Sequence, residues 1–207
     1  ADKVGSLEVG KQADIITINY QTPRLMPLYN PAHALILGGN GTGKSTLLKT
    51  LYGEVDLYEG DATVVGFDLR TIRRKQIPYL RRSIGIVFQD FQLLSDRSVE
   101  DNLSFVLEAT GWNDKDAISK RIDEVLQQVG LPHKRKSMPH QMSGGEQQRI
   151  AVARALINNP SIVLADEPSG NLDSQSAKEL HELFFNLRNE TGQTFIIVTH
   201  NPQLAEM

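Results

Sequence analysis

Short apolar runs alternate along the chain with segments in which apolar side chains recur every three to four residues. Four of these runs have the length of a strand and are bounded by polar or turn residues: residues 34–37, 84–88, 162–165 and 195–198. Leu47, Leu48 and Leu51 start a helical pattern soon after the first run. Strands that alternate with helices form parallel sheets covered by helices, so the pattern predicts an α/β fold.

The middle of the chain has a helical pattern instead. Ser98 and Asp101 have the spacing of a capping box at the start of a helix. A stripe of helical period follows at Ile118, Ile122, Val125, Leu126 and Val129, and Gly130 and Pro132 end it. A further stripe comprises Leu180, Leu183, Phe184 and Leu187, before Gly192. We therefore predict a helical lobe over residues 91–160, inserted into a core of residues 34–90 and 161–207.

Composition narrows the class of protein. The 207 residues suffice for one domain with an insertion. The net charge is −3 and Lys and Arg are scattered, so no basic face indicates nucleic acid as a partner. The absence of cysteine excludes disulfides, thiolate metal sites and a cysteine nucleophile, and suits a reducing compartment. No apolar run reaches the roughly 20 residues of a membrane span, and the first residues lead into no signal-peptide core.

A glycine-rich segment lies between the first apolar run and the first helical pattern. It matches G-x-x-x-x-G-K-[ST] and comprises Gly38, Gly39, Asn40, Gly41, Thr42, Gly43, Lys44, Ser45 and Thr46. Glycines let backbone N–H groups point at phosphates, and the following helix N-terminus adds positive charge. We expect Lys44 to contact the β and γ phosphates and Ser45 to ligate Mg²⁺. An ordinary glycine-rich turn is disfavoured, because every fixed position and the flanking periodicity agree.

Two carboxylates follow the apolar run 162–165. Asp166 and Glu167 would lie at the carboxyl end of a buried strand, the edge at which such sheets bind ligands. Asp166 is the candidate Mg²⁺ partner, through water, and Glu167 the candidate catalytic base, ionised at neutral pH with a reference pKa of about 4.3. Taken alone, the pair fits solvated acids at a strand end equally well. The glycine-rich motif favours the catalytic interpretation.

Residues 142–149 contain a serine three positions before a glutamate. Ser143 and Glu146 therefore fit a capping box, which is the structural alternative. Capping does not require Gly144 and Gly145, which leave the helix N-terminus open to a γ-phosphate from outside. The two interpretations are compatible.

This octet resembles the LSGGQ signature of the ABC ATPase family, with Met at its first position and Glu at its fifth. Gln89 resembles the family's Q-loop glutamine, residues 169–173 its D-loop and His200 its switch histidine. Alone, a glutamine after a strand or a histidine after an apolar run is more often structural than functional. Here all the motifs occur in the family's order.

The resemblance implies a P-loop NTPase core, with a parallel sheet flanked by helices, and an inserted α-helical ABC subdomain. It implies ATP hydrolysis with Mg²⁺ in a head-to-tail homodimer that sandwiches two ATP molecules. Each copy would complete the other's site through Ser143, Gly144, Gly145, Glu146 and Asp173. The catalytic residues implied are Lys44, Glu167 and His200, and the metal ligands are Ser45, Gln89 and Asp166.

Within the family, residues 88–94 and 96–102 most resemble the cell-division branch, while residues 165–173 are shared with the lipoprotein-release and macrolide-export branches. This implies a cytoplasmic protein, peripheral on the inner face of the cell membrane, whose partner is an integral membrane subunit that Gln89 couples to the ATP site. Two alternatives stay open. One is a soluble ABC ATPase acting on nucleic acid or ribosomes, which the lack of basic patches and heptads disfavours. The other is an ABC domain with impaired catalysis.

The first 33 residues depart from the family's pattern. Tyr20 and Tyr29 are the only aromatic residues before the glycine-rich loop, and both lie closer to it than the family's adenine-stacking residue, so we expect packing or surface roles. Residues 5–16 and 22–31 resemble the closing β segment of amidohydrolase-type deaminases, without the clustered His and Asp ligands of such enzymes. Members of the ABC family normally continue beyond the position of Met207, so we expect reduced stability of this chain alone.

Overall fold

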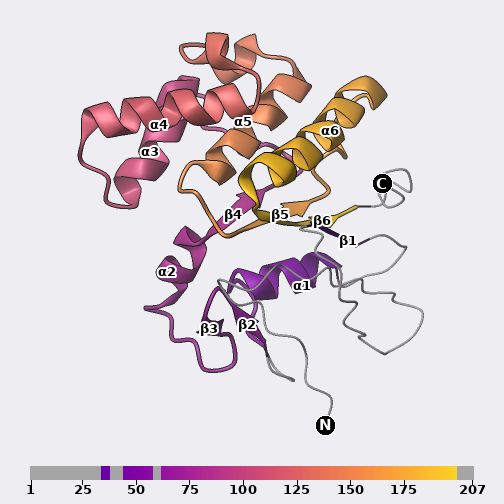
Figure 1. The fold of residues 1–207 in the computed structure, drawn as a ribbon. Helices are drawn as coiled ribbons and strands as arrows, with labels where there is room; N and C mark the ends of the chain where they lie inside the picture. The colour runs from indigo at the N-terminus through magenta and orange to yellow at the C-terminus, as the bar shows by residue number, and fades with distance from the viewer. Residues whose placement is uncertain (1–33, 38–43, 58–61, 200–207) are drawn as a thin grey trace.

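The computed structural model describes residues 34–37, 44–57 and 62–199. Four parallel strands form the central sheet: β1 (Ala34–Leu37), β4 (Ile84–Val87), β5 (Ile162–Asp166) and β6 (Thr194–Val198). Their order across the sheet is β1-β6-β5-β4, as Figure 1 shows. All four were predicted as apolar runs. The runs differ from the strands only at their ends, since β4 stops one residue earlier and β5 and β6 are each one residue longer.

Three elements before β4 had no counterpart in the apolar pattern. Strands β2 (Thr63–Val64) and β3 (Phe67–Asp68) form an antiparallel hairpin, and helix α2 (Ile77–Arg82) follows it. The hairpin turn places both Val65 and Gly66 at positive φ, 49° and 80°. Strands of two residues are too short to show a period, and a β-branched residue is uncommon at positive φ, so the pattern could not reveal this turn.

The remaining helices follow the predicted patterns. Helix α1 (Lys44–Leu51) starts directly after the glycine-rich loop. Helices α3 (Val99–Ala109) and α4 (Lys115–Gln128) lie between β4 and β5 in the chain, followed by the 3₁₀ turns η1 (Pro132–Lys134) and η2 (Pro139–Gln141) and by α5 (Gly144–Leu156). Helix α6 (Ser174–Thr191) connects β5 to β6. No helix in these described ranges is long and apolar enough to span a membrane.

Local capping explains where several of these helices begin and end. Ser98 and Asp101 form the predicted capping box at the start of α3. Gly130 and Gly192 adopt positive φ, 72° and 66°, just after α4 and α6. Because glycine reaches this conformation without a steric penalty, these positions end the helices as expected.

The sheet is covered on both faces, which explains why its strands are continuous apolar runs. Along β5 the side chains alternate: Ile162 and Leu164 pack with Leu48 of α1, whereas Val163 and Ala165 belong to the core formed with α5 and α6. Figure 1 shows α1 on one side of the sheet and α5 and α6 on the other. The core formed with α5 and α6 continues without interruption from the sheet through α5 into α3 and α4. The proposed boundaries at residues 90/91 and 160/161 stay a prediction.

Helix α5 approaches β4 unusually closely. A Cβ atom added to Gly85 would lie 2.5 Å from the backbone oxygen of Ala155, well inside contact distance. Only glycine permits this separation, so β4 and the end of α5 are held together by backbone packing.

Candidate active site

The glycine-rich loop has the predicted place in the chain. β1 ends at Leu37 and α1 begins at Lys44, so the loop joins a parallel strand to a helix N-terminus. Residues 38–43 themselves, the side chains of Lys44 and Ser45, and His200 lie outside what the structure describes. Thr46 is exposed on the first turn of α1. The roles of these residues stay predictions.

The two carboxylates follow one another at the carboxyl end of β5. Asp166 is the last residue of this strand and pairs with Val198 of β6. Glu167 has a φ of 46°, in the left-handed region, and its N–H donates to the Val198 oxygen over 2.9 Å. Its own carbonyl accepts from the Gly170 N–H at 3.0 Å. This conformation costs on the order of 1 kcal/mol or more for a residue with a Cβ, and such strain concentrates at functional sites.

Gln89, just beyond β4, is tied to the segment that follows β5. Its Nε2 donates to Asn171 Oδ1 at 3.1 Å, and Asn171 Nδ2 donates to the Gln89 carbonyl at 3.1 Å. Gly170 permits this approach, because a Cβ there would lie 2.8 Å from Gln89 Nε2. The structure therefore joins the predicted Q-loop and D-loop segments through a reciprocal pair of amides.

The side-chain oxygens of Gln89 and Asp166 are suited to bind Mg²⁺. Since the Gln89 amide nitrogen is engaged with Asn171, its oxygen is the group that can face a cation, and Asp166 adds a carboxylate from the neighbouring strand. Within the part of the chain that the structure describes, no cluster of three or more His, Asp and Glu could hold a metal alone. Mg²⁺ is commonly held by one or two protein oxygens together with phosphate oxygens and water, which matches this set.

A buried amide that sequence reasoning missed connects these loops. Gln148 of α5 is fully buried, and its Nε2 donates to the Phe88 carbonyl at 3.0 Å and to the Pro168 carbonyl at 2.7 Å. One side chain thus fixes the residue before Gln89 and the residue after Glu167. The sequence signal was a polar residue on the buried face of α5, three residues after Gly145 and four before Val152.

A second side chain of α5 holds the turn after Gln89. Phe91 and Gln92 both have positive φ, 59° and 50°. Arg154 donates to the Phe91 carbonyl at 2.9 Å and also to the carbonyl of Gln92. Helix α5 therefore positions the Q-loop segment at two points, and the loop after β5 at one.

The start of α5 has the predicted capping box. Ser143 Oγ accepts from the Glu146 N–H at 3.2 Å, and Glu146 Oε2 accepts from the Ser143 N–H at 2.9 Å. Ser143 remains exposed, so capping does not hide it from a ligand. Gly145 is buried, and a Cβ there would lie 2.9 Å from Ser176 Oγ. Close packing against α6 is therefore one reason for this glycine, which the sequence did not reveal.

Asp173 caps the neighbouring helix α6. Its carboxylate accepts from the Ser176 N–H at 3.0 Å and from Ser176 Oγ at 2.7 Å. Both bonds lower the pKa of Asp173 below its ordinary value, and the bond from the Ser176 N–H has the larger effect. Since Ser176 also packs against Gly145, the D-loop and signature segments of one copy lie together. Whether Asp173 and Ser143 to Glu146 contact nucleotide in a second copy stays a prediction.

One known family covers most of the segments brought together here. The family model for the ABC transporter matches residues 26–170. This chain belongs to that family. As an ABC ATPase it binds ATP with Mg²⁺ and hydrolyses ATP to ADP and phosphate.

Two relatives of this ABC ATPase are named for cell division and for lipoprotein release. The cell division ATP-binding protein FtsE of Streptococcus pneumoniae is 47% identical over 172 residues, covering 83% of this chain and 74% of the relative. The lipoprotein-releasing system ATP-binding protein LolD of Bacteroides fragilis is 44% identical over 174 residues, covering 83% and 80%. These relatives favour the transporter-type ATPase over an ABC protein that acts on nucleic acid.

Solved structures support the same fold. The structure of cbiO1 from Clostridium perfringens, part of the ABC transporter complex cbiONQ, matches with a TM-score of 0.76 at 33% identity, covering 91% of this chain and 78% of that one. The dimeric bacterial ABC transporter cassette MJ0796 matches with a TM-score of 0.74 at 31% identity, covering 95% and 89%. A further MJ0796 dimer is in a post-hydrolysis state bound to ADP and Pi.

Proposed function

We propose that two copies of this ABC ATPase associate head to tail around two ATP molecules, and that their closure drives an integral membrane subunit of the FtsX type. The observation that carries the proposal is the position of Ser143. It is exposed at the start of α5, while the buried Gln148 and the partly buried Arg154 of the same helix hold the loops that carry Gln89 and Glu167. A contact made at the surface by the signature segment is thus linked mechanically to the hydrolytic loops.

In this proposal each residue acts on the nucleotide or on the attacking water. Lys44 and residues 38–43 bind the phosphates, Ser45, Gln89 and Asp166 hold the cation, and His200 contacts the γ-phosphate. Mg²⁺ supplies charge neutralisation of the phosphates when bound. Glu167 orients the water and accepts its proton. The strained backbone at Glu167, tied to Val198 and Gly170, supports this role, because it directs the carboxylate from a rigid turn.

The test of the head-to-tail dimer uses two serines with the same structural role. Ser143 and Ser98 both cap helices within capping boxes, so replacing either with Ala should cost about 1 kcal/mol of stability. We expect Ser143→Ala to weaken association in Mg²⁺-ATP at least tenfold, whereas Ser98→Ala leaves it within about twofold. Light scattering over a protein concentration series, in a Glu167→Gln background that slows hydrolysis, measures this. Equal effects of the two variants would show that Ser143 acts only as a cap.

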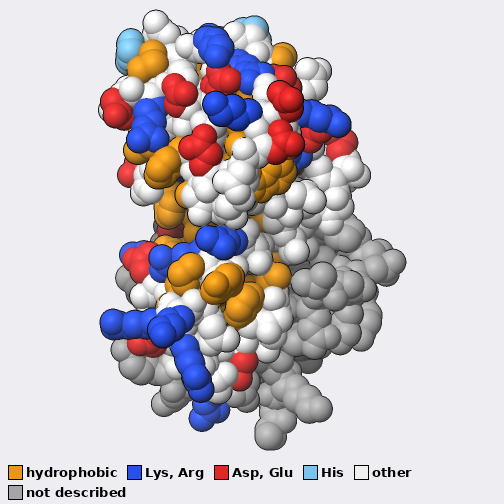
Figure 2. All heavy atoms as spheres, turned by 90° about the vertical axis from the view of Figure 1, so that its left-hand side faces the viewer, with side chains coloured by type: hydrophobic (Ala, Val, Ile, Leu, Met, Phe, Trp, Pro, Cys, Tyr) orange, Lys and Arg blue, Asp and Glu red, His pale blue; other side chains and the backbone are white. Residues whose placement is uncertain are grey.

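A groove beside the edge strand β4 supports docking of a membrane subunit. It measures about 430 Å³ and includes Ile86 of β4, Phe105 and Val106 of α3, and Arg81 and Arg82 of α2. Phe105 is 47% exposed although it is a large apolar side chain. Figure 2 shows apolar side chains gathered across the middle of this face, with Lys and Arg side chains below them. An amphipathic cytoplasmic helix with acidic residues at its margin fits this combination.

The groove gives the membrane proposal its own test. Phe105→Glu places a charge in the apolar part of the groove, so recruitment to vesicles containing an FtsX-type subunit should fall at least tenfold. Gln127→Glu adds the same charge on the exposed surface of α4 and should leave recruitment unchanged. Flotation of vesicles with and without the subunit measures this binding, and light scattering checks that association in Mg²⁺-ATP persists. Unchanged recruitment of Phe105→Glu would exclude the groove as the docking site.

A further inference from the structure

The signature segment carries a negative charge at a position that the proposed function places near a polyphosphate. Glu146 stands where the family's pattern has glutamine, at the third residue of α5. A carboxylate there would repel the phosphates of an ATP bound to a second copy, and repulsion of this kind costs several kcal/mol in a poorly solvated interface. The neutral glutamine of the family pattern has no such cost. The proposed dimer therefore requires either that the Glu146 carboxylate lies away from the phosphates or that a nearby cation compensates its charge.

Lys134 supplies such a cation. Its Nζ lies 2.9 Å from Glu146 Oε1, and the two side chains are only 22% and 21% exposed. The other carboxylate oxygen, Oε2, accepts from the Ser143 N–H. Both oxygens of Glu146 are thus engaged within its own copy. The pKa of Glu146 is lowered, first by the hydrogen bond from Lys134 and then by that from the Ser143 N–H, so this carboxylate carries its charge at neutral pH.

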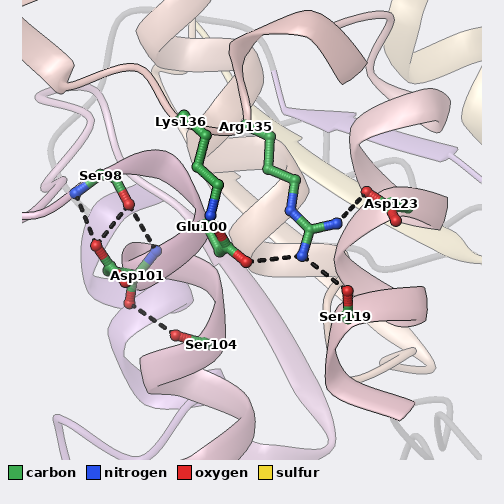
Figure 3. A network of polar contacts seen from close by, with 8 residues as sticks. All are labelled: Ser98, Glu100, Asp101, Ser104, Ser119, Asp123, Arg135 and Lys136. Atoms are coloured by element: carbon green, nitrogen blue, oxygen red, sulfur yellow. Dashed lines mark hydrogen bonds and ion pairs between the residues drawn. The ribbon is translucent and has the colours of Figure 1, made fainter. Parts of the chain in front are cut away.

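Arg135, the residue after Lys134, holds this loop against two helices. Arg135 donates to Glu100 of α3 at 2.7 Å and to Asp123 and Ser119 of α4 at 2.5 and 2.8 Å, and Lys136 also pairs with Glu100. Figure 3 shows the Arg135 guanidinium lying between α3 and α4, bonded to residues of both.

Backbone bonds fix the same loop to the start of α3. The Glu100 N–H donates to the Arg135 carbonyl, and the Val99 N–H donates to the Ser137 carbonyl, each over 2.9 Å. The loop therefore presents Lys134 to Glu146 from a rigid support rather than from a flexible arm, which lowers the entropy lost in forming the ion pair.

We infer that Lys134 is a positioning residue that compensates the charge of Glu146 and so makes this signature segment compatible with the phosphates of ATP on a second copy. The inference rests on the proposed head-to-tail dimer. Lys134 and Glu146 together present no net charge, as the single glutamine of the family pattern does. If so, association of the two copies requires Lys134 only while residue 146 is acidic.

A double-mutant cycle tests this dependence. In a Glu167→Gln background that slows hydrolysis, Lys134→Met should weaken association in Mg²⁺-ATP by at least about tenfold. Adding Glu146→Gln should restore it to within about twofold of the background protein, because glutamine keeps the capping box and removes the charge. Lys136→Met removes the neighbouring cation of the same loop and should change association less than twofold. Sedimentation across a concentration series gives each dissociation constant.

The outcomes separate this inference from the proposed dimer. If the background protein itself stays monomeric in Mg²⁺-ATP, the head-to-tail proposal fails and the inference fails with it. If that protein dimerises but the double variant is as weak as Lys134→Met, Lys134 has only a structural role and the inference is overturned. An equal loss in Lys136→Met, or no loss in Lys134→Met, would overturn it too. The expected defect of Lys134→Met should also shrink at high salt, where the repulsion is screened.

Discussion

Replacing Glu167 with Gln should lower the turnover of saturating ATP by at least about a hundredfold and leave Mg²⁺-ATP binding intact. An amide cannot accept a proton from the attacking water, and loss of a general base typically costs about 10² to 10⁴ in rate. The substitution keeps size and backbone, so the left-handed turn at φ 46° should persist. The chain should then accumulate as an ATP-bound dimer. Phosphate release measures turnover, and light scattering measures the dimer.

The control for this variant removes a carboxylate elsewhere. Glu182 pairs with Lys178 along the exposed side of α6, and its side chain is 55% exposed. Glu182→Gln changes the net charge by the same amount and should keep wild-type turnover. Unchanged turnover in Glu167→Gln would remove Glu167 from the role of base, and the proton would then have to leave by another acceptor.

Gly85→Ala should destabilise the folded chain by about 3 kcal/mol and lower its Tm by about 10 °C. The new Cβ would meet the Ala155 oxygen at 2.5 Å and the Ala155 carbonyl carbon at 3.1 Å. Both are backbone atoms, so no side chain can rotate to relieve the overlap. Relief requires β4 and α5 to separate, which also loosens the apolar core between them.

Denaturant unfolding at equilibrium measures this change, and a glycine at the start of α5 provides the comparison. At Gly144 a Cβ would lie 3.6 Å from Leu172 Cδ2, an ordinary contact distance. Gly144→Ala should therefore change the free energy of unfolding by less than about 1 kcal/mol. If Gly85→Ala unfolds at the same denaturant concentration as the parent chain, the close approach of β4 and α5 does not constrain the fold.

The parts of the fold that the sequence predicted are those with a local cause. β5 was predicted because its residues are buried on both faces, which leaves no polar position between Ile162 and Ala165. The start of α3 was predicted because Ser98 bonds a residue only three positions away. The position of the glycine-rich loop followed from its neighbours, Leu37 and Lys44. Such features need no knowledge of distant partners.

The parts that were missed depend on partners far away in the chain. Gln148 bonds carbonyls 60 and 20 residues away, and Gln89 bonds Asn171 across 82 residues. Nothing around Gln148 indicates that its amide joins two loops, because the same spacing would suit a solvated glutamine. Lys134 is equally ordinary until the fold places it beside Glu146. Motifs therefore predicted the reacting groups, and tertiary structure alone revealed the side chains that hold the loops carrying Gln89 and Glu167.

The order of the strands has a consequence for how this chain is made on the ribosome. Among the described strands, β1 pairs only with β6, so Ala34 lies opposite Phe195. The strand that leads into the nucleotide loop emerges early, yet its neighbour in the sheet is the last of the described strands to be synthesised. Pairing between such distant segments is slow, because a long loop must close first. ATP is therefore expected to stabilise only chains whose synthesis has passed Val198, so nucleotide binding favours chains that already contain β6 over shorter nascent ones.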